Sequence, residues 1–277
     1  MKRVNFKVGK NCISCLETGI KGQPIVLFLH GIPACAEIWR ETMDKVSSKG
    51  FHCLAPDLSG YGQTEINEIE YYSLFGNAKL FNQWLSEQDF SKVWLVAHDL
   101  GGAVAQIMLT DNPSLFQKVT LCNVGTANTY PVPTIAKLVK ASKIGLFYWL
   151  ALLGRFNADK LFVGMKRFFV RNKSFSKSEF ERVFFDGKFH KRKSVANFQK
   201  MLARLDNRYT VENMENLKDV KIPVHLLWAT DDKFQSWEVS GKILESTLKN
   251  VRISKIENCG HYLQIDANNE FVDKLLS

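Results

Sequence analysis

Short apolar runs, each ending at a turn or a polar residue, recur in the first and last parts of this chain. Residues 24–29, 93–96 and 224–229 are almost continuously apolar, which is typical of strands buried on both faces of a parallel sheet. Residues 37–49 and 74–88 have the amphipathic pattern of helices. This alternation of buried strand and amphipathic helix predicts an α/β fold.

Further strands complete the expected sheet. Residues 51–55, 119–123 and 251–256 have strand patterns. At the start of the chain, residues 3–30 read as a β-meander that turns at the glycine-containing segment 19–22. The pattern therefore predicts a sheet that begins with a meander and continues with parallel strands.

The alternation stops after the strand at 119–123. Residues 127–215 are helical and aromatic in pattern before the strand pattern returns, so we expect a helical cap at 127–215 and a core made of 1–126 and 216–277. The longest apolar stretch, residues 144–153, has ten residues and is too short to span a bilayer.

Residues 93–102 carry the strongest chemical signal. Four apolar residues and Ala97 lead to Asp99, and paired glycines then open a helix-like stretch. A strand, a sharp turn and a helix, with small residues around the turn, form a nucleophile elbow. A serine at this place attacks carbonyl groups, whereas the carboxylate of Asp99 attacks a saturated carbon and becomes an alkyl ester. The alternative is that Asp99 has only a structural role, but such a role does not require a carboxylate at an elbow.

Two further signals follow in the order nucleophile, acid, histidine. The strand at 224–229 ends near Asp231 and Asp232, and His261 comes soon after the strand at 251–256. This is the order of the α/β-hydrolase fold, in which each group follows the carboxyl end of a strand.

The motifs resemble those of the α/β-hydrolase superfamily, in particular the group of epoxide hydrolases and haloalkane dehalogenases, whose nucleophile is an aspartate. The resemblance implies a mostly parallel central sheet flanked by helices, an inserted helical cap, and hydrolysis without a cofactor or a metal ion. It covers the core on both sides of the cap. The motifs are HGIP (30–33), APDLSGYGQT (55–64), AHDLGG (97–102), WATDD (228–232) and NCGH (258–261).

The resemblance also implies roles for individual residues. Asp99 would attack the substrate, and His261 would activate the water that hydrolyses the resulting ester. Asp232, in the last position of WATDD, matches the acid of the family better than Asp231 does and would orient the imidazole. His98 is expected to support its loop, since an HD pair of a metal phosphohydrolase needs further ligands on helices.

The backbone N–H groups of Ile32 and Leu100 are the expected oxyanion hole. The same two positions weaken the case for a dehalogenase. Haloalkane dehalogenases typically have Asn and Trp there, and haloacetate dehalogenases have Arg after the nucleophile. Asn123 and Trp149 each carry a side-chain N–H group, so by residue type they are substitute hydrogen-bond donors to a halide.

Epoxide opening needs an acid for the departing oxygen, and similar epoxide hydrolases use two cap tyrosines. The cap region contains Tyr130, Tyr148 and Tyr209. Tyr148 has a placement comparable with the first tyrosine of the pair, and Tyr209 comes later than the second is expected. An epoxide hydrolase producing a vicinal diol is the favoured function. A haloalkane or haloacid dehalogenase and a binding protein without turnover are the alternatives.

Composition adds limits on partners. The net charge is +9, and residues 134–200 contain sixteen Lys or Arg against four Asp or Glu. Such a segment attracts anions or an anionic surface, or is the solvated outside of a lid. No nucleic-acid-binding module accompanies the charge. Aromatic residues such as Phe147 and Trp149 predict a pocket for a small apolar or amphipathic substrate reacting with water.

The cellular setting is inferred from two weaker features. The first residues lack the apolar segment of a secretion signal, and the six scattered cysteines fit a reducing compartment. We therefore expect a cytoplasmic protein. The sequence does not indicate its oligomeric state.

Overall fold

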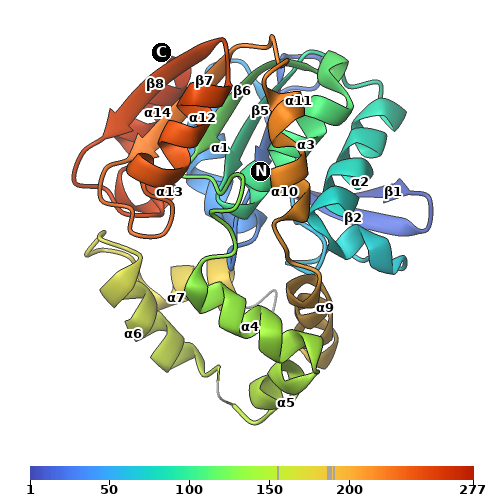
Figure 1. Cartoon of the computed structure of the whole chain (residues 1–277), viewed down its shortest axis with the longest axis vertical. Coiled ribbons are helices and arrows are strands. Elements are labelled where there is room, and N and C mark those ends of the chain that lie inside the picture. The colour runs from blue at the N-terminus through green and yellow to red at the C-terminus, as the bar shows by residue number, and fades with distance from the viewer. Residues whose placement is uncertain (155, 186–188, 190) are drawn as a thin grey trace.

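The computed structural model describes residues 1–154, 156–185, 189 and 191–277. Eight strands form one sheet in the order β1-β2-β4-β3-β5-β6-β7-β8 (Figure 1). Their bounds are β1 Lys2–Val8, β2 Asn11–Thr18, β3 Ile25–Leu29, β4 His52–Pro56, β5 Val93–His98, β6 Phe116–Cys122, β7 Val224–Ala229 and β8 Val251–Ile256.

The sheet is antiparallel at its first edge and parallel elsewhere. β1 pairs with β2 and β2 with β4 in antiparallel fashion, whereas the pairs from β4 to β8 are parallel. The expected meander is therefore wrong in one respect, because β3 does not pair with β2. It lies between β4 and β5, where its apolar side chains are covered on both faces.

Helices cover both faces of this sheet (Figure 1). α1 packs against α14, and α2 packs against α3. The bounds are α1 Arg40–Ser47, α2 Leu74–Glu87, α3 Leu100–Asp111, α4 Pro133–Lys143, α5 Leu146–Leu152, α6 Ala158–Phe168, α7 Lys177–Phe180, α9 Arg192–Ala203, α10 Arg208–Glu212, α11 Met214–Leu217, α12 Lys242–Thr247, α13 Leu263–Asp266 and α14 Asn268–Leu276. Single 3₁₀ turns lie at Ala36–Trp39, Ile69–Tyr72 and Pro113–Leu115, and π-helical turns at Glu181–Phe185 and Trp237–Gly241.

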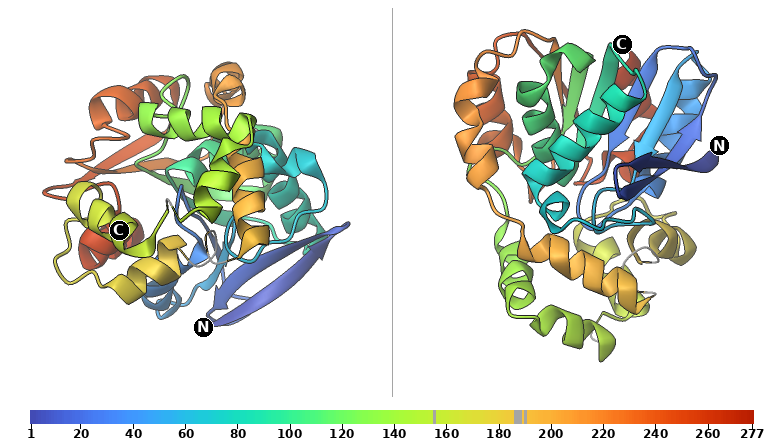
Figure 2. Two further views of the ribbon diagram at one scale, coloured as in Figure 1. Left: turned by 90° about the horizontal axis from the view of Figure 1, so that it is seen from below. Right: turned by 90° about the vertical axis from the view of Figure 1, so that its right-hand side faces the viewer.

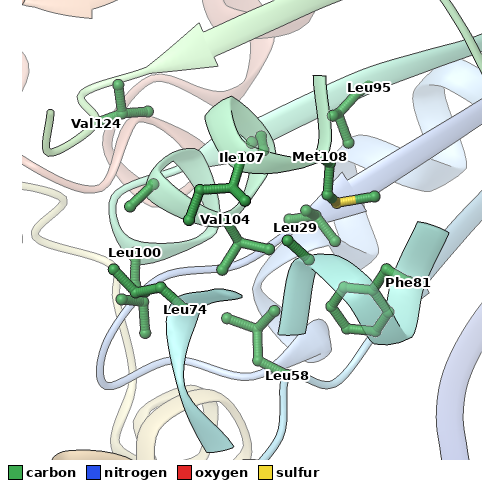
Figure 3. Packing of buried hydrophobic residues seen from close by; sticks show 14 of the residues in the cluster. Leu29, Leu58, Leu74, Phe81, Leu95, Leu100, Val104, Ile107, Met108 and Val124 are labelled. Atoms are coloured by element: carbon green, nitrogen blue, oxygen red, sulfur yellow. The ribbon is translucent and has the colours of Figure 1, made fainter. Parts of the chain in front are cut away.

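Helix α3 is almost entirely enclosed and fixes the centre of one hydrophobic core. Its Val104, Ile107 and Met108 pack with Leu29 of β3 and Leu95 of β5 (Figure 3). All five side chains are at most 4% exposed. A fully apolar helix face against a fully apolar strand is stabilised mainly by removal of that surface from water. This packing holds the start of α3 firmly at the carboxyl end of β5.

Between β6 and β7 the chain leaves the sheet and forms the helices from α4 to α9. Figure 1 and the right view in Figure 2 place these helices beyond the carboxyl ends of the strands. Helix α10 lies wholly and α11 partly within the expected cap range 127–215, yet both pack against α3 beside the sheet. We call residues 133–203 the inserted helices. Within the described part of the chain, no helix is both long and apolar enough to cross a membrane.

The mostly parallel sheet with helices on both faces confirms the fold class predicted from the sequence. Strand order reverses at β3, because β4 lies on one side of it and β5 on the other. In open α/β sheets, such a reversal leaves a crevice at the carboxyl ends of the two strands, where ligands bind. HGIP follows β3 and Asp99 follows β5, so both motifs flank this crevice.

Candidate active site

Asp99 occupies a strained turn between β5 and α3. Its φ of 49° and ψ of −115° lie outside the regions that side-chain-bearing residues commonly adopt. The neighbouring glycines make the turn possible. A Cβ on Gly101 would lie 2.5 Å from the Leu29 carbonyl oxygen, and one on Gly31 would lie 2.5 Å from Oδ1 of Asp99. The small residues in both motifs therefore permit the backbone to approach the carboxylate closely.

The Asp99 carboxylate is held by backbone amides on one side and faces histidine on the other. The Ile32 N–H donates to Oδ1 at 2.9 Å, and the neighbouring Leu100 amide also acts to lower the pKa of this carboxyl. Oδ2 lies 3.7 Å from Nε2 of His261. The carboxylate thus has one oxygen fixed by an amide and the other turned toward a proton acceptor.

Burial raises the pKa of the Asp99 carboxyl above its ordinary value, while His261 and the amides of Ile32 and Leu100 oppose that rise. Desolvation weakens the hydration of an ion, and fixed N–H groups replace part of it. A carboxylate in this position is less hydrated than one on the surface, which makes it a better nucleophile.

His261 is buried between two carboxylates. Its Nδ1 lies 2.8 Å from Oδ2 of Asp232, which leaves Nε2 to face Asp99. Burial by itself lowers the pKa of His261, but the charge and the hydrogen bond of Asp232, together with Asp99, hold that pKa above the ordinary value. The imidazole can therefore accept a proton at Nε2 and keep the resulting charge beside Asp232.

Asp232 is anchored by three donors besides His261. The Phe234 and Gln235 amides donate to its Oδ1 at 2.7 and 3.2 Å, and Nδ2 of Asn123 donates to its Oδ2 at 2.6 Å. Burial acts to raise the pKa of Asp232, but His261 and these donors hold it well below its usual range. The carboxylate stays ionised and cannot rotate away from the imidazole.

The adjacent Asp231 lies in a different environment. It forms an ion pair with Arg171 at 2.7 Å, and a third of its side chain is exposed. Asn123, expected as a halide donor, is also placed elsewhere: its Oδ1 accepts the Ala229 N–H at 2.9 Å while its amide holds Asp232. The structure thus assigns Asn123 to the support of Asp232 and corrects its expected place in the pocket.

His98 supports the loop that carries His261. Its Nε2 donates to the His261 carbonyl oxygen at 2.8 Å. Burial, with His261 nearby, lowers the pKa of His98 to about 3, so the ring stays neutral. Within the described residues, no group of three or more His, Cys, Asp or Glu side chains could hold a metal ion.

A cavity of about 310 Å³ is lined by Asp99 and His261 together with side chains of the inserted helices. Its lining is mostly apolar and rich in phenylalanine, with Phe147 and Phe198 on the far wall. Ile32 contributes from the loop after β3. We call this cavity the chamber. Its volume suits a small organic molecule.

Two buried hydrogen-bond donors line the chamber without a partner among the described residues: the Tyr130 hydroxyl and Nε2 of Gln235. Tyr130 is 1% exposed and Gln235 is also 1% exposed. Both residues lie beside Gly125, since a Cβ there would be 3.0 Å from Tyr130 Cβ and 3.3 Å from Gln235 Nε2. Buried donors normally have partners, so each of the two is a candidate hydrogen-bond donor to a ligand.

The proton donors expected from the sequence lie elsewhere. Tyr148 is not among the chamber residues, and its ring packs edge-on against Trp149. Trp149 is 63% exposed. Tyr209 stacks on Phe75 at the surface of the core, with ring centroids 5.4 Å apart. None of Tyr148, Trp149 and Tyr209 lines the chamber, which corrects their expected places there, whereas Phe147 lines it as expected.

The sequence pattern favours Tyr148 over Tyr130 and gives no expectation for Gln235. Gln235 comes three positions after Asp232, so its place near the acid could have been found. The signal for Tyr130 was its position soon after β6, because segments that leave the carboxyl ends of strands pass the crevice.

Comparison with known proteins identifies the family. Residues 24–268 match the family model of the alpha/beta hydrolase fold. The chain belongs to the α/β-hydrolase family. It is a hydrolase of this family by fold and by the match of nearly its whole length.

Curated relatives of this hydrolase include several activities. Monoacylglycerol lipase abhd6-B of Xenopus laevis is 27% identical over 86% of this chain and 70% of that protein. Epoxide hydrolase 1 of Caenorhabditis elegans is 24% identical over 98% of this chain and 69% of that protein. A haloalkane dehalogenase of Bradyrhizobium diazoefficiens is 39% identical over 32% of this chain and 28% of that protein.

Solved structures agree with the fold. A haloalkane dehalogenase from Bradyrhizobium elkani superposes with a TM-score of 0.80 at 22% identity, over 99% of this chain and 96% of the other. Together with the relatives, this confirms the resemblance to the epoxide hydrolase and haloalkane dehalogenase group.

Proposed function

We propose that this hydrolase works through a covalent alkyl ester on Asp99 and that its substrate is an epoxide. The observation that carries the proposal is a carboxylate at the elbow with one oxygen on the Ile32 amide and the other beside His261. A carboxylate held in this way attacks a saturated carbon, and its ester is then within reach of a base.

In the first step, Oδ2 of Asp99 attacks an epoxide carbon and the C–O bond of the ring breaks. The leaving oxygen takes a proton from the Tyr130 hydroxyl, and the Gln235 amide donates a hydrogen bond to it. Burial, with the Asp99 charge, raises the pKa of Tyr130 well above its usual value, so the phenol keeps its proton until the ring oxygen becomes basic. General acids of this kind speed such steps by about 10²–10⁴-fold.

In the second step, His261 takes a proton from water through Nε2, and the water oxygen attacks the ester carbon of Asp99. The negative charge then develops on Oδ1, where the amides of Ile32 and Leu100 stabilise it. The tetrahedral intermediate collapses, the alkoxide takes the proton of its new hydroxyl group and leaves as a vicinal diol, Asp99 is again a carboxylate, and His261 releases its proton to solvent. Tyr130 is reprotonated from solvent.

A halide is the competing leaving group. The same donors, Tyr130 and Gln235, can hydrogen-bond a departing halide without transferring a proton, so a dehalogenase remains the second candidate. Epoxide opening is favoured because the leaving alkoxide needs a proton, which a protonated phenol can supply, whereas a leaving halide needs none. A binding protein that performs no turnover is the third candidate.

The decisive experiment traps the ester. In His261→Gln the base is lost while Asp99 is still free to react, so an epoxide should leave an adduct of its own mass on the intact protein. Peptide mapping should place the adduct on Asp99, and Asp99→Asn in the same background should abolish it.

A panel of terminal, internal and aryl epoxides, with matched alkyl halides, separates the candidates. Adducts from epoxides alone, with diol release by the wild type, support the proposal. Adducts from halides alone make the protein a dehalogenase. An adduct on another residue contradicts the role of Asp99, and no adduct from any member of the panel favours the binding protein.

A further inference from the structure

Exposed apolar side chains are concentrated at one end of the molecule. Among the residues that the structure describes, seven of the fourteen exposed large apolar side chains fall within residues 144–168. This segment includes α5 and the whole of α6, at the end farthest from the sheet (Figure 1). We call them the tip residues: Ile144, Leu146, Trp149, Leu152, Leu153, Val163 and Phe168.

Helix α5 has apolar residues on every side but is covered on only one. Its sequence is LFYWLAL. Phe147 is 1% exposed and lines the chamber, whereas Trp149 is 63% and the following Leu153 is 78% exposed. A helix that is hydrophobic all round is normally buried on all sides. Packing of the chamber wall explains the inner face of α5, but nothing in the described fold covers the outer one.

Cations flank the tip residues on two helices. Lys137, Lys140 and Lys143 lie on the exposed face of α4, and Lys160 and Arg167 are exposed on α6. Among the described residues, none of these five side chains has a carboxylate within ion-pair distance, whereas Lys45, Lys218 and Lys242 elsewhere do. Unpaired cations next to exposed aromatic and aliphatic side chains are typical of surfaces that bind anionic membranes.

We propose that the tip residues and the flanking cations dock this hydrolase on the surface of a bilayer that contains anionic phospholipid. Trp149 and Leu153 enter the headgroup region, and the lysines of α4 contact lipid phosphates. The excess of positive charge favours an anionic membrane over a second copy of the chain, since two tips would bring like charges together.

Docking in this way has a consequence for the chamber. Phe168 is 62% exposed and also lines the chamber, as does the exposed Lys160. The end of the molecule turned toward the viewer in the left view of Figure 2 carries these helices. An apolar molecule dissolved in the bilayer would therefore meet the docked protein beside two residues, Phe168 and Lys160, that line the chamber. The docking proposal itself depends on no catalytic role.

Vesicle binding by the whole protein tests the proposal. Co-sedimentation is measured with vesicles of phosphatidylcholine alone and with vesicles in which a third of the lipid is phosphatidylglycerol. Binding should be at least about tenfold stronger to the anionic vesicles and should weaken with added salt. The emission of Trp149 should shift to the blue, because four of the other tryptophans are already buried.

Two sets of variants separate docking through the tip residues from nonspecific adsorption to vesicles. Trp149→Ser with Leu153→Ser should weaken binding to anionic vesicles at least about tenfold. The matched control, Val211→Ser with Val239→Ser, changes two exposed apolar residues of the core and should bind as the wild type does. Reversal of Lys137, Lys140 and Lys143 to Glu should weaken binding at least about tenfold, whereas reversal of Lys10, Lys49 and Lys79 should weaken it much less.

Several results would overturn the proposal. Absence of binding to anionic vesicles is one, and equal loss in the tip and control variants is another. A dimer that light scattering detects and that Trp149→Ser with Leu153→Ser dissociates, without vesicle binding, would assign the tip to a second copy. None of these results bears on the ester at Asp99.

Discussion

The two sides of the chamber are built in different ways. On the side of the sheet, polar side chains lie at strand ends and are fixed by short hydrogen bonds, as Asp232 is by the Phe234 amide at 2.7 Å and by Asn123 at 2.6 Å. On the side of the inserted helices, the wall is made of aromatic rings such as Phe147 and Phe198, whose centroids are 5.6 Å apart.

The difference implies that the sheet side controls the reaction and that the inserted helices control which substrates fit. Directional bonds to backbone amides set the positions of reacting atoms to within a fraction of an ångström, as catalysis demands. Contacts between rings are weak individually and tolerate changes of shape. Substitutions at the sheet side should therefore change rates, and substitutions in the inserted helices should change which molecules fit and how firmly the helices pack.

The largest effect is expected at the acid. Asp232→Asn leaves the side-chain volume unchanged but removes the charge that orients and stabilises His261, so turnover should fall by about 10⁴-fold. Hydrolysis of the Asp99 ester should account for most of the loss. Stopped-flow detection of ester formation and decay measures the two steps separately.

Asp231→Asn is the matched control, because Asp231 has the same side chain one position away and pairs with Arg171 instead. It should lower turnover less than about tenfold. If Asp231→Asn proved the more damaging change, the assignment of the acid would be reversed.

The pH dependence should move with the same residue. His261 accepts a proton only when it is neutral, so ester hydrolysis is lost as the pH falls through its pKa. Asp232 holds that pKa above the ordinary value. In Asp232→Asn the pKa should fall, and the acidic limb of single-turnover ester decay should move to lower pH. A limb that stayed in place would mean that another group titrates there.

A smaller effect is expected at Tyr130, in the loop after β6. Tyr130→Phe removes the hydroxyl and leaves the ring, so alkylation of Asp99 by an epoxide should slow by about 10²-fold. Alkylation by a halide should slow much less, since a halide needs no proton. Rapid-quench mass spectrometry of the adduct gives both rates.

Tyr148→Phe provides the control for that experiment, and it should leave epoxide alkylation within about twofold of the wild type because its ring packs on Trp149 outside the chamber. A reversed result would restore Tyr148 as the proton donor. Equal losses with epoxide and halide in Tyr130→Phe would instead indicate damage to the chamber.

The smallest effects compare two helical glycines. A Cβ on Gly102 would collide with the Val124 side chain, so Gly102→Ala should lower the free energy of unfolding by about 1–3 kcal/mol. Gly164 lies inside α6 with no atom near that position, so Gly164→Ala should raise it by about 0.5–1 kcal/mol. Urea denaturation of each variant tests the opposite signs, and equal signs would contradict the contrast drawn between the two sides.

Much of the fold could be predicted because its signals are local. The strands 224–229 and 251–256 match β7 and β8 residue for residue. The nearly continuous apolar run of β7 is mostly buried and β8 begins with alternating apolar and polar residues, and both patterns are visible in the sequence itself. Asp99 and His261 could be selected because small residues and strand ends mark them. The sequence did not reveal that β3 lies between β4 and β5, because strand pairing depends on contacts between distant residues.

The α/β-hydrolase fold and the groups at the strand ends follow from the sequence alone, because each depends on the residues immediately around it. Which side chains of the inserted helices and loops line the chamber depends instead on the tertiary structure. Tyr148 and Tyr130 carry the same side chain, so residue type does not distinguish them. The direction of a helical side chain depends on how the helix is rotated about its axis and on what the helix packs against. Tyr130 and Gln235 line the chamber, whereas Tyr148 packs on Trp149 and does not line it.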